Sequence, residues 1–133
     1  MKKFRLPSDD LEYDILARLW EVGVGSVREL HEHLGGRDGL VYTTTAKVVD
    51  RLREKGLIER QPRGRAFIYR PRVAREEVEN ARARRAVNRL FGAAAAPHAA
   101  VAALVDAVDA VDPKLLDELE RIVLARRRSK DGA

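Results

Sequence analysis

The sequence contains no cysteine, which excludes disulfides, thiol catalysis, iron–sulfur clusters and cysteine-based metal sites. Long hydrophobic runs are also missing: nothing approaches the roughly eighteen apolar residues of a membrane span, and no apolar stretch follows the basic residues at the N-terminus. Aromatic residues make up only 5% of the chain, too few for a platform on which single-stranded nucleic acid could stack. We therefore expect a cytoplasmic protein with no signal peptide and no membrane insertion.

Catalytic and cofactor motifs are absent too. The chain has no phosphate-binding glycine loop and no nucleophile-elbow motif. His31 and His33 stand two residues apart on a predicted helix and point to different sides, which is poor geometry for a metal ion. The carboxylates at 9–14 crowd the start of a predicted helix, where they stabilise its dipole. We expect neither an enzyme nor a bound cofactor or metal.

What the sequence does have is concentrated positive charge. The 133 residues carry 26 Lys+Arg against 21 Asp+Glu, a net charge of +5. Between residues 47 and 75, ten basic residues stand against three acidic ones, whereas residues 92–125 carry two basic and six acidic residues. A basic block on a folded frame indicates a polyanionic partner, which the C-terminal part would repel.

Capping residues and helical periodicity predict three helices in the first half of the chain. They run from Asp9 to Gly23, from Ser26 to Gly35, and from the threonine run at 43–45 to a left-handed cap at Gly56. From 57 to 70 the pattern changes to two-residue alternation, which predicts a β-hairpin whose turn chemistry comes from Pro62 and Gly64. Trp20, Phe67 and Tyr69 are interpreted as core and hairpin packing.

The second half of the chain predicts further helices. A helical pattern continues to Phe91 and ends at Gly92, and two more helices follow a joint broken by Pro97. Their apolar faces have too little chain to enclose them, which indicates a helical dimerisation arm. The residues expected in the dimer are Val101, Leu104, Val108, Leu116, Leu119 and Val123. The predicted fold is mainly α with a small β-hairpin: a winged helix-turn-helix domain over 1–72 followed by a helical dimerisation domain over 73–133.

Helix, turn, helix and wing is the arrangement that lets one helix enter a major groove of DNA. The residues expected to bind DNA lie at the start of the third helix and on the hairpin turn: Thr43, Thr44, Lys47, Arg51, Arg63 and Arg65. Two other interpretations stay open, a protein-interaction module on a winged-helix scaffold and a DNA-binding activator. Arg60, Arg70 and Arg72 could hold phosphates or protect an edge strand.

Four stretches resemble the BlaI/MecI/CopY (penicillinase repressor) family of winged-helix regulators: LEYDILARLW, SVRELHEHL, VYTTTAKVVDRLREKGLIER and RAFIYRP. The order and spacing match from about residue 8 to 125. The resemblance implies a homodimeric repressor that binds a palindromic operator through its third helix and wing. It places Thr43, Thr44 and Lys47 at base-contacting positions and Arg51 at a common basic position.

The resemblance also implies regulation of β-lactam-resistance or related stress genes. Some family members are inactivated by cleavage of the C-terminal arm, triggered by a membrane sensor-protease, which is therefore an implied partner. The Asn-Phe pair cleaved in those relatives aligns with Leu104-Val105, so the same cleavage rule does not carry over. The cysteine cluster of copper-responsive relatives is absent, which excludes copper sensing by that route.

Overall fold

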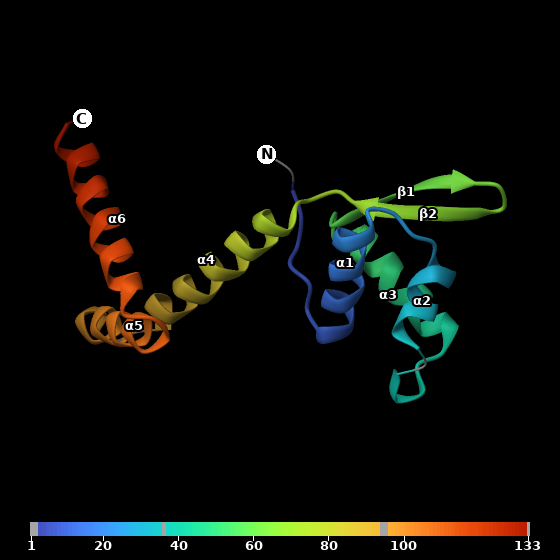
Figure 1. The fold of residues 1–133 in the computed structure, drawn as a ribbon, viewed down its shortest axis with the longest axis horizontal. Helices are drawn as coiled ribbons and strands as arrows, with labels where there is room; N and C mark the ends of the chain where they lie inside the picture. The colour runs from blue at the N-terminus through green and yellow to red at the C-terminus, as the bar shows by residue number, and fades with distance from the viewer. Residues whose placement is uncertain (1–2, 36, 94–95, 133) are drawn as a thin grey trace. The chain divides into compact units, whose positions relative to one another are not determined.

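A computed structural model describes residues 3–35, 37–93 and 96–132 of the chain, which divides into two compact units, Met1–Arg84 and Arg85–Ala133. The elements in order are α1 (Asp10–Val22), α2 (Val27–Leu34), a short 3-10 helix (Arg37–Gly39), α3 (Tyr42–Glu54), β1 (Ile58–Arg63), β2 (Ala66–Pro71), α4 (Arg75–Ala93), α5 (Pro97–Val111) and α6 (Lys114–Asp131) (Figure 1). The prediction of a mainly helical chain with one β-hairpin is confirmed.

The first two helices begin at the capping residues that the sequence indicates. The carboxylate of Asp9 accepts a hydrogen bond from the backbone N–H of Glu12 at 2.8 Å. Ser26 and Glu29 form the reciprocal capping box of α2, with both hydrogen bonds at 3.1 Å. Beyond α3, Gly56 has φ +78°, and a Cβ there would lie 2.7 Å from the carbonyl oxygen of Lys3, so both conformation and packing require glycine.

The hairpin is tighter than expected. β1 and β2 pair antiparallel with Arg63 opposite Ala66, so the turn consists of Gly64 and Arg65 alone. Gly64 has φ +63°, as suits the first position of a two-residue turn. The placement of Pro62 in the turn was wrong, because it lies within β1. Proline is tolerated on such an edge strand because its missing N–H can face away from the partner strand.

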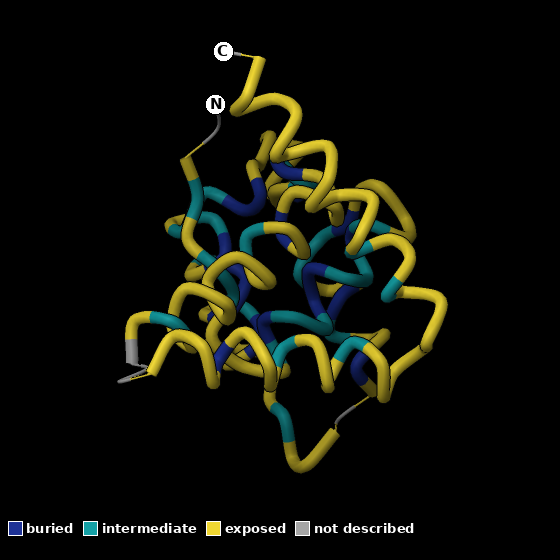
Figure 2. Tube along the Cα trace, turned by 90° about the vertical axis from the view of Figure 1, so that its left-hand side faces the viewer, coloured by how far each residue is buried: buried dark blue, intermediate teal, exposed yellow. Residues whose placement is uncertain are grey.

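The core of the first unit consists of buried residues from α1, α2, α3 and the base of the hairpin. Figure 2 marks buried residues in dark blue along the trace. The loop before α2 ties the hairpin to this core, since Gly25 and Tyr69 exchange backbone hydrogen bonds of 2.9 and 2.8 Å. Val73 and Val78 are also buried in the core. The first compact unit therefore ends at Arg84, whereas the sequence analysis set the domain boundary after residue 72. The indole N–H of Trp20 donates to the carbonyl oxygen of Val73 at 2.9 Å and fixes this continuation.

The second unit contains the pair α5 and α6, which pack on one another. The carboxylate of Asp112, just before α6, accepts a hydrogen bond from the backbone N–H of Lys114 at 3.0 Å. α4 continues to Ala93, two residues beyond Phe91, which the sequence predicted as its last residue. Gly92 keeps a helical backbone there rather than the left-handed conformation of a cap.

Among the described residues, no helix combines the length and the apolar character that crossing a bilayer requires.

Candidate nucleic-acid interface

One side of α3 is open to solvent while the other is in the core. Thr45, Val48, Val49 and Leu52 are the buried residues of the helix. Thr43, Thr44, Lys47 and Arg51 are all exposed. The helix therefore presents the four side chains that the sequence predicted for it on its outer surface.

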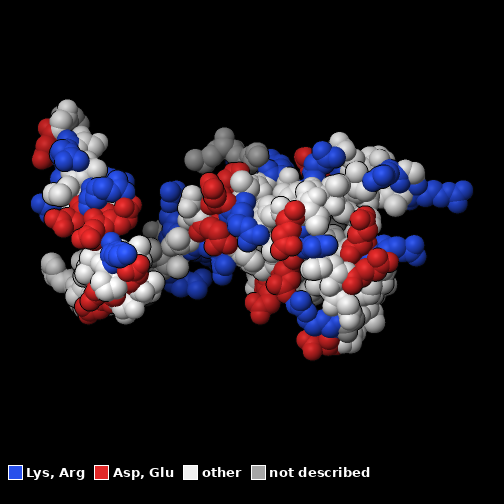
Figure 3. Space-filling model, in the orientation of Figure 1, with Lys and Arg blue, Asp and Glu red and all other residues white. Residues whose placement is uncertain are grey.

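The tip of the hairpin carries the second part of the predicted site. Arg63 and Arg65 flank Gly64 and are both exposed. The basic side chains there extend beyond the rest of the surface in Figure 3, at the end where Figure 1 draws the turn. Among the residues that the structure describes, neither arginine has a carboxylate partner within ion-pair distance. Their charge is available to an external anion.

A groove of about 540 Å³ lies between the start of α3 and the hairpin. It is lined by Ser26, Val27, Arg28, Tyr42, Ala66 and Phe67. Because Tyr42 begins α3 and Ala66 follows the hairpin turn, this groove brings the two predicted halves of the site to one face. Its aromatic and basic lining consists of residues that the sequence analysis did not assign to the site.

Phe67 packs within the hairpin, as predicted, but it is not part of the core. Its side chain is 40% exposed, and the guanidinium of Arg60 lies 4.0 Å from the centre of its ring. Strand alternation puts Phe67 on the same side of β2 as Tyr69, which is buried and only 6% exposed. Phe67 is two residues nearer the tip of the hairpin, which extends past the helices (Figure 1). The strand alternation was therefore predicted correctly, but the core does not extend as far along the hairpin as Phe67.

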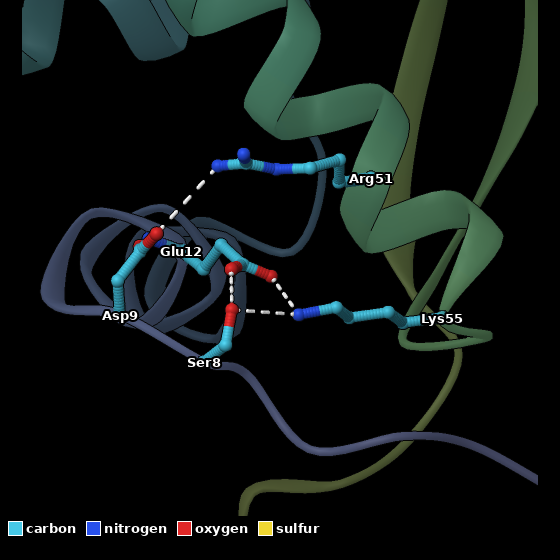
Figure 4. A network of polar contacts seen from close by, with 5 residues as sticks. All are labelled: Ser8, Asp9, Glu12, Arg51 and Lys55. Atoms are coloured by element: carbon cyan, nitrogen blue, oxygen red, sulfur yellow. Dashed lines mark hydrogen bonds and ion pairs between the residues drawn. The ribbon is translucent and has the colours of Figure 1, made fainter.

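The positive charge of α3 is largely matched within the protein. Arg53 pairs with Asp50 on the same helix at 2.9 Å. Arg51 lies 3.6 Å from Asp9 at the start of α1, with both side chains about half exposed (Figure 4). Lys47 has no carboxylate partner within the described chain. Of the basic residues on α3, therefore, only Lys47 lacks a carboxylate partner within the described chain. It lies close to Thr43 and Thr44 in the sequence.

Lys55, the fourth basic residue of this segment, has a structural role. Its ammonium donates to Glu12 at 2.6 Å and to the hydroxyl of Ser8 at 3.0 Å, and Ser8 also donates to Glu12 (Figure 4). Burial raises the pKa of Glu12, but the hydrogen bonds from Lys55 and Ser8 and the charge of Lys55 outweigh it, so this pKa lies below its usual value. The ion pair between Glu12 and Lys55 joins the start of α1 to the end of α3.

Two arginines on the hairpin have partners of their own. Arg72 donates to the carbonyl oxygens of Lys3 and Gly56 at 3.1 and 3.2 Å, which ties the N-terminal segment to the root of the hairpin. Arg70 donates to the side-chain oxygen of Gln61 across the strands at 2.9 Å. Both of these interactions stabilise the first unit itself.

Comparison with known proteins gives the family. Residues 9–125 match the penicillinase repressor family. The chain belongs to this family. Two proteins described as transcriptional regulator BlaI, from the CDC 1551 / Oshkosh and ATCC 25618 / H37Rv strains of Mycobacterium tuberculosis, are each 37% identical to it over 70 residues. Those residues are 52% of this chain and 51% of each relative, so the match spans about half the length of these curated proteins.

A solved structure supports the fold of this penicillinase repressor family member. The solution structure of the DNA binding domain of the repressor BlaI matches with a TM-score of 0.50 and 23% sequence identity. It aligns over 58% of this chain and 93% of its own length. The predicted winged-helix fold and the resemblance to the family are both confirmed.

Proposed function

We propose that this penicillinase repressor family member is a sequence-specific DNA-binding transcriptional repressor, which acts as a homodimer on a palindromic operator. One observation carries the proposal: a single groove is lined both by Tyr42, the first residue of the exposed start of α3, and by Ala66, which directly follows the exposed Arg65 of the hairpin turn. A helix next to a basic wing is the arrangement that reads a major groove while holding the adjacent backbone.

The side chains divide into two roles. Thr43 and Thr44 can hydrogen-bond base edges and bring their methyl groups to thymine, and Lys47 adds a cation beside them. Arg63 and Arg65 have long, exposed side chains on either side of Gly64, which suits contacts to phosphates that fix register without reading sequence. Arg51 is half exposed beside Asp9 and can turn free guanidinium N–H groups toward a phosphate. The operator occupied in this way is closed to the polymerase.

The apolar surface of the second unit supports the homodimer. Among its described residues only Ala100 is buried. Leu104, Val108, Leu116 and Leu119 are partly covered, while Val101 and Val123 are 50% and 42% exposed. A helical pair with so little core of its own gains stability by packing against a second copy. Two copies would place one winged helix on each half of a palindrome.

Loss of single charges tests the interface. Arg63→Ala should weaken binding to operator and scrambled DNA alike and lower the salt slope by about 0.9, the share of one phosphate contact. Lys47→Ala should weaken operator binding more than scrambled binding because it stands beside the base-reading threonines. Fluorescence anisotropy across a salt series measures both effects.

Arg18→Ala is the matched control, because it removes the same charge from α1, where Arg18 pairs with Glu21. If Arg63→Ala and Lys47→Ala changed affinity no more than Arg18→Ala does, these residues would be outside the interface.

The regulated genes follow from the family alone. We propose β-lactam-resistance or related stress genes as targets. A membrane sensor-protease is the corresponding partner, acting at a sequence other than the Asn-Phe pair, since Leu104-Val105 occupies that place within α5.

A further inference from the structure

His31 connects α2 to the inner side of α3. Its Nδ1 and the Oγ1 of Thr45 share a hydrogen bond of 2.8 Å, and Thr45 is fully buried. The imidazole ring also meets the ring of Tyr42 edge to face, with 5.6 Å between centres and 78° between planes. Within the described residues, His31 belongs to no group of three or more side chains that could hold a metal ion.

The two partners of His31, Tyr42 and Thr45, stand directly before and after the two threonines proposed to read bases. Tyr42 and Thr45 are three residues apart and therefore share one face of α3. Thr43 and Thr44 lie between them in the sequence and are exposed. The imidazole of His31 thus contacts the first turn of α3 through Tyr42 and Thr45, and the side chains of Thr43 and Thr44 stay exposed.

The first turn of α3 needs such support because it has no side-chain cap. Asp9 caps α1 and Ser26 caps α2, whereas Val41 precedes α3 without a side-chain hydrogen bond. An uncapped first turn leaves backbone N–H groups unsatisfied and frays readily. The contacts of His31 with the side chains of Tyr42 and Thr45 do not bond these N–H groups, but they hold the first turn of α3 against α2.

We propose that His31 is a positioning residue for sequence readout, which fixes the first turn of α3 in the rotation that presents Thr43 and Thr44 to bases. This inference rests on the DNA-binding function proposed above. Phosphate contacts made by the hairpin tip do not depend on that rotation. His31 therefore governs the preference for operator over scrambled DNA and leaves the affinity for scrambled DNA unchanged.

The test uses the full chain and the two partners of one hydrogen bond. His31→Phe keeps a ring beside Tyr42 but removes the hydrogen bond, and Thr45→Val removes the hydroxyl at nearly constant volume. Each should reduce the operator preference about tenfold. The double variant should lose little more than either single variant, because both remove the same interaction. His31→Asn, whose amide can occupy the place of Nδ1, should recover part of the loss.

His33→Ala is the matched control, since His33 is exposed on the same helix. It should leave the operator preference unchanged. The inference is overturned if folded His31→Phe keeps the wild-type preference, if the two single losses add in the double variant, or if His33→Ala has the same effect as His31→Phe.

Amide hydrogen exchange in the DNA-free chain separates this inference from the proposed function. His31→Phe should speed exchange at residues 42–45 while the rest of α3 keeps its protection. Unchanged exchange there would refute this role of His31, whatever the DNA results. Faster exchange there in a protein whose wild type shows no operator preference would support this role of His31 and refute the DNA-binding function instead.

Discussion

Removing residues 92–133 should convert a dimer into a monomer and weaken operator binding by about a hundredfold or more, because the two half-sites are then bound independently. The shortened chain keeps the complete first compact unit, which ends at Arg84. It loses α5 and α6, the helices with the exposed apolar stripe. Sedimentation velocity gives the oligomeric state, and anisotropy with an operator fragment gives the affinity.

A full-length variant guards against effects of truncation. Leu116→Asp with Leu119→Asp places two charges in the proposed dimer contact and should also give a monomer with weak operator binding. Both positions are only partly covered in a single chain, so the charges remain solvated in the monomer. A truncated chain that sediments as a dimer would show that the contact between copies lies within residues 1–91.

Replacing Glu12 by alanine should lower the free energy of unfolding by about 3–5 kcal/mol, the usual effect of removing one partner of a buried ion pair. Glu12 is fully buried, and the side chain of Lys55 is only 14% exposed, so the ammonium is left without its anion. Urea denaturation measures the loss. Glu54→Ala removes an exposed carboxylate from α3 and should change stability little, so equal losses in the two variants would contradict a structural role for the pair.

The same pair predicts a pH dependence. The pKa of Glu12 is lower in the folded protein than in the unfolded chain, so its contribution is complete above the unfolded pKa and is lost as pH falls through the folded one. The difference in stability between the wild type and Glu12→Gln should therefore shrink on acidification below the usual carboxyl range. A constant difference across that range would mean that the charge of Glu12 contributes nothing.

Local signals in the sequence were enough for the helices and the hairpin. Asp9 and Ser26 bond backbone groups three residues away, and the left-handed backbone of Gly56 ends its own helix, so these three roles could be predicted. The exposed positions of Thr43 and Lys47 followed from helical periodicity for the same reason. Pro62 was wrongly placed in the turn because proline is common in turns. It is also tolerated on an edge strand, where its missing N–H faces away from the partner strand, and it pairs with Phe67 there.

Contacts between distant segments could not be predicted in this way. Asp9 and Glu12 lie more than forty residues from Arg51 and Lys55, and only the packing of α1 against α3 brings them together. The basic block in the sequence therefore overstates the charge that α3 offers to DNA. The N-terminal segment gave no periodic signal, yet Phe4 packs against the core and the N–H of Arg5 donates to the carbonyl oxygen of Lys55 at 2.8 Å.

The most direct test of the proposed function is the anisotropy of the purified chain with fragments selected from its source genome, competed by scrambled DNA at physiological salt. A sequence-specific repressor should prefer a palindromic fragment by about a thousandfold or more. Weak binding with equal competition by scrambled DNA would contradict the proposal. The exposed basic face would then serve nonspecific contacts or an acidic protein surface on the same winged-helix fold.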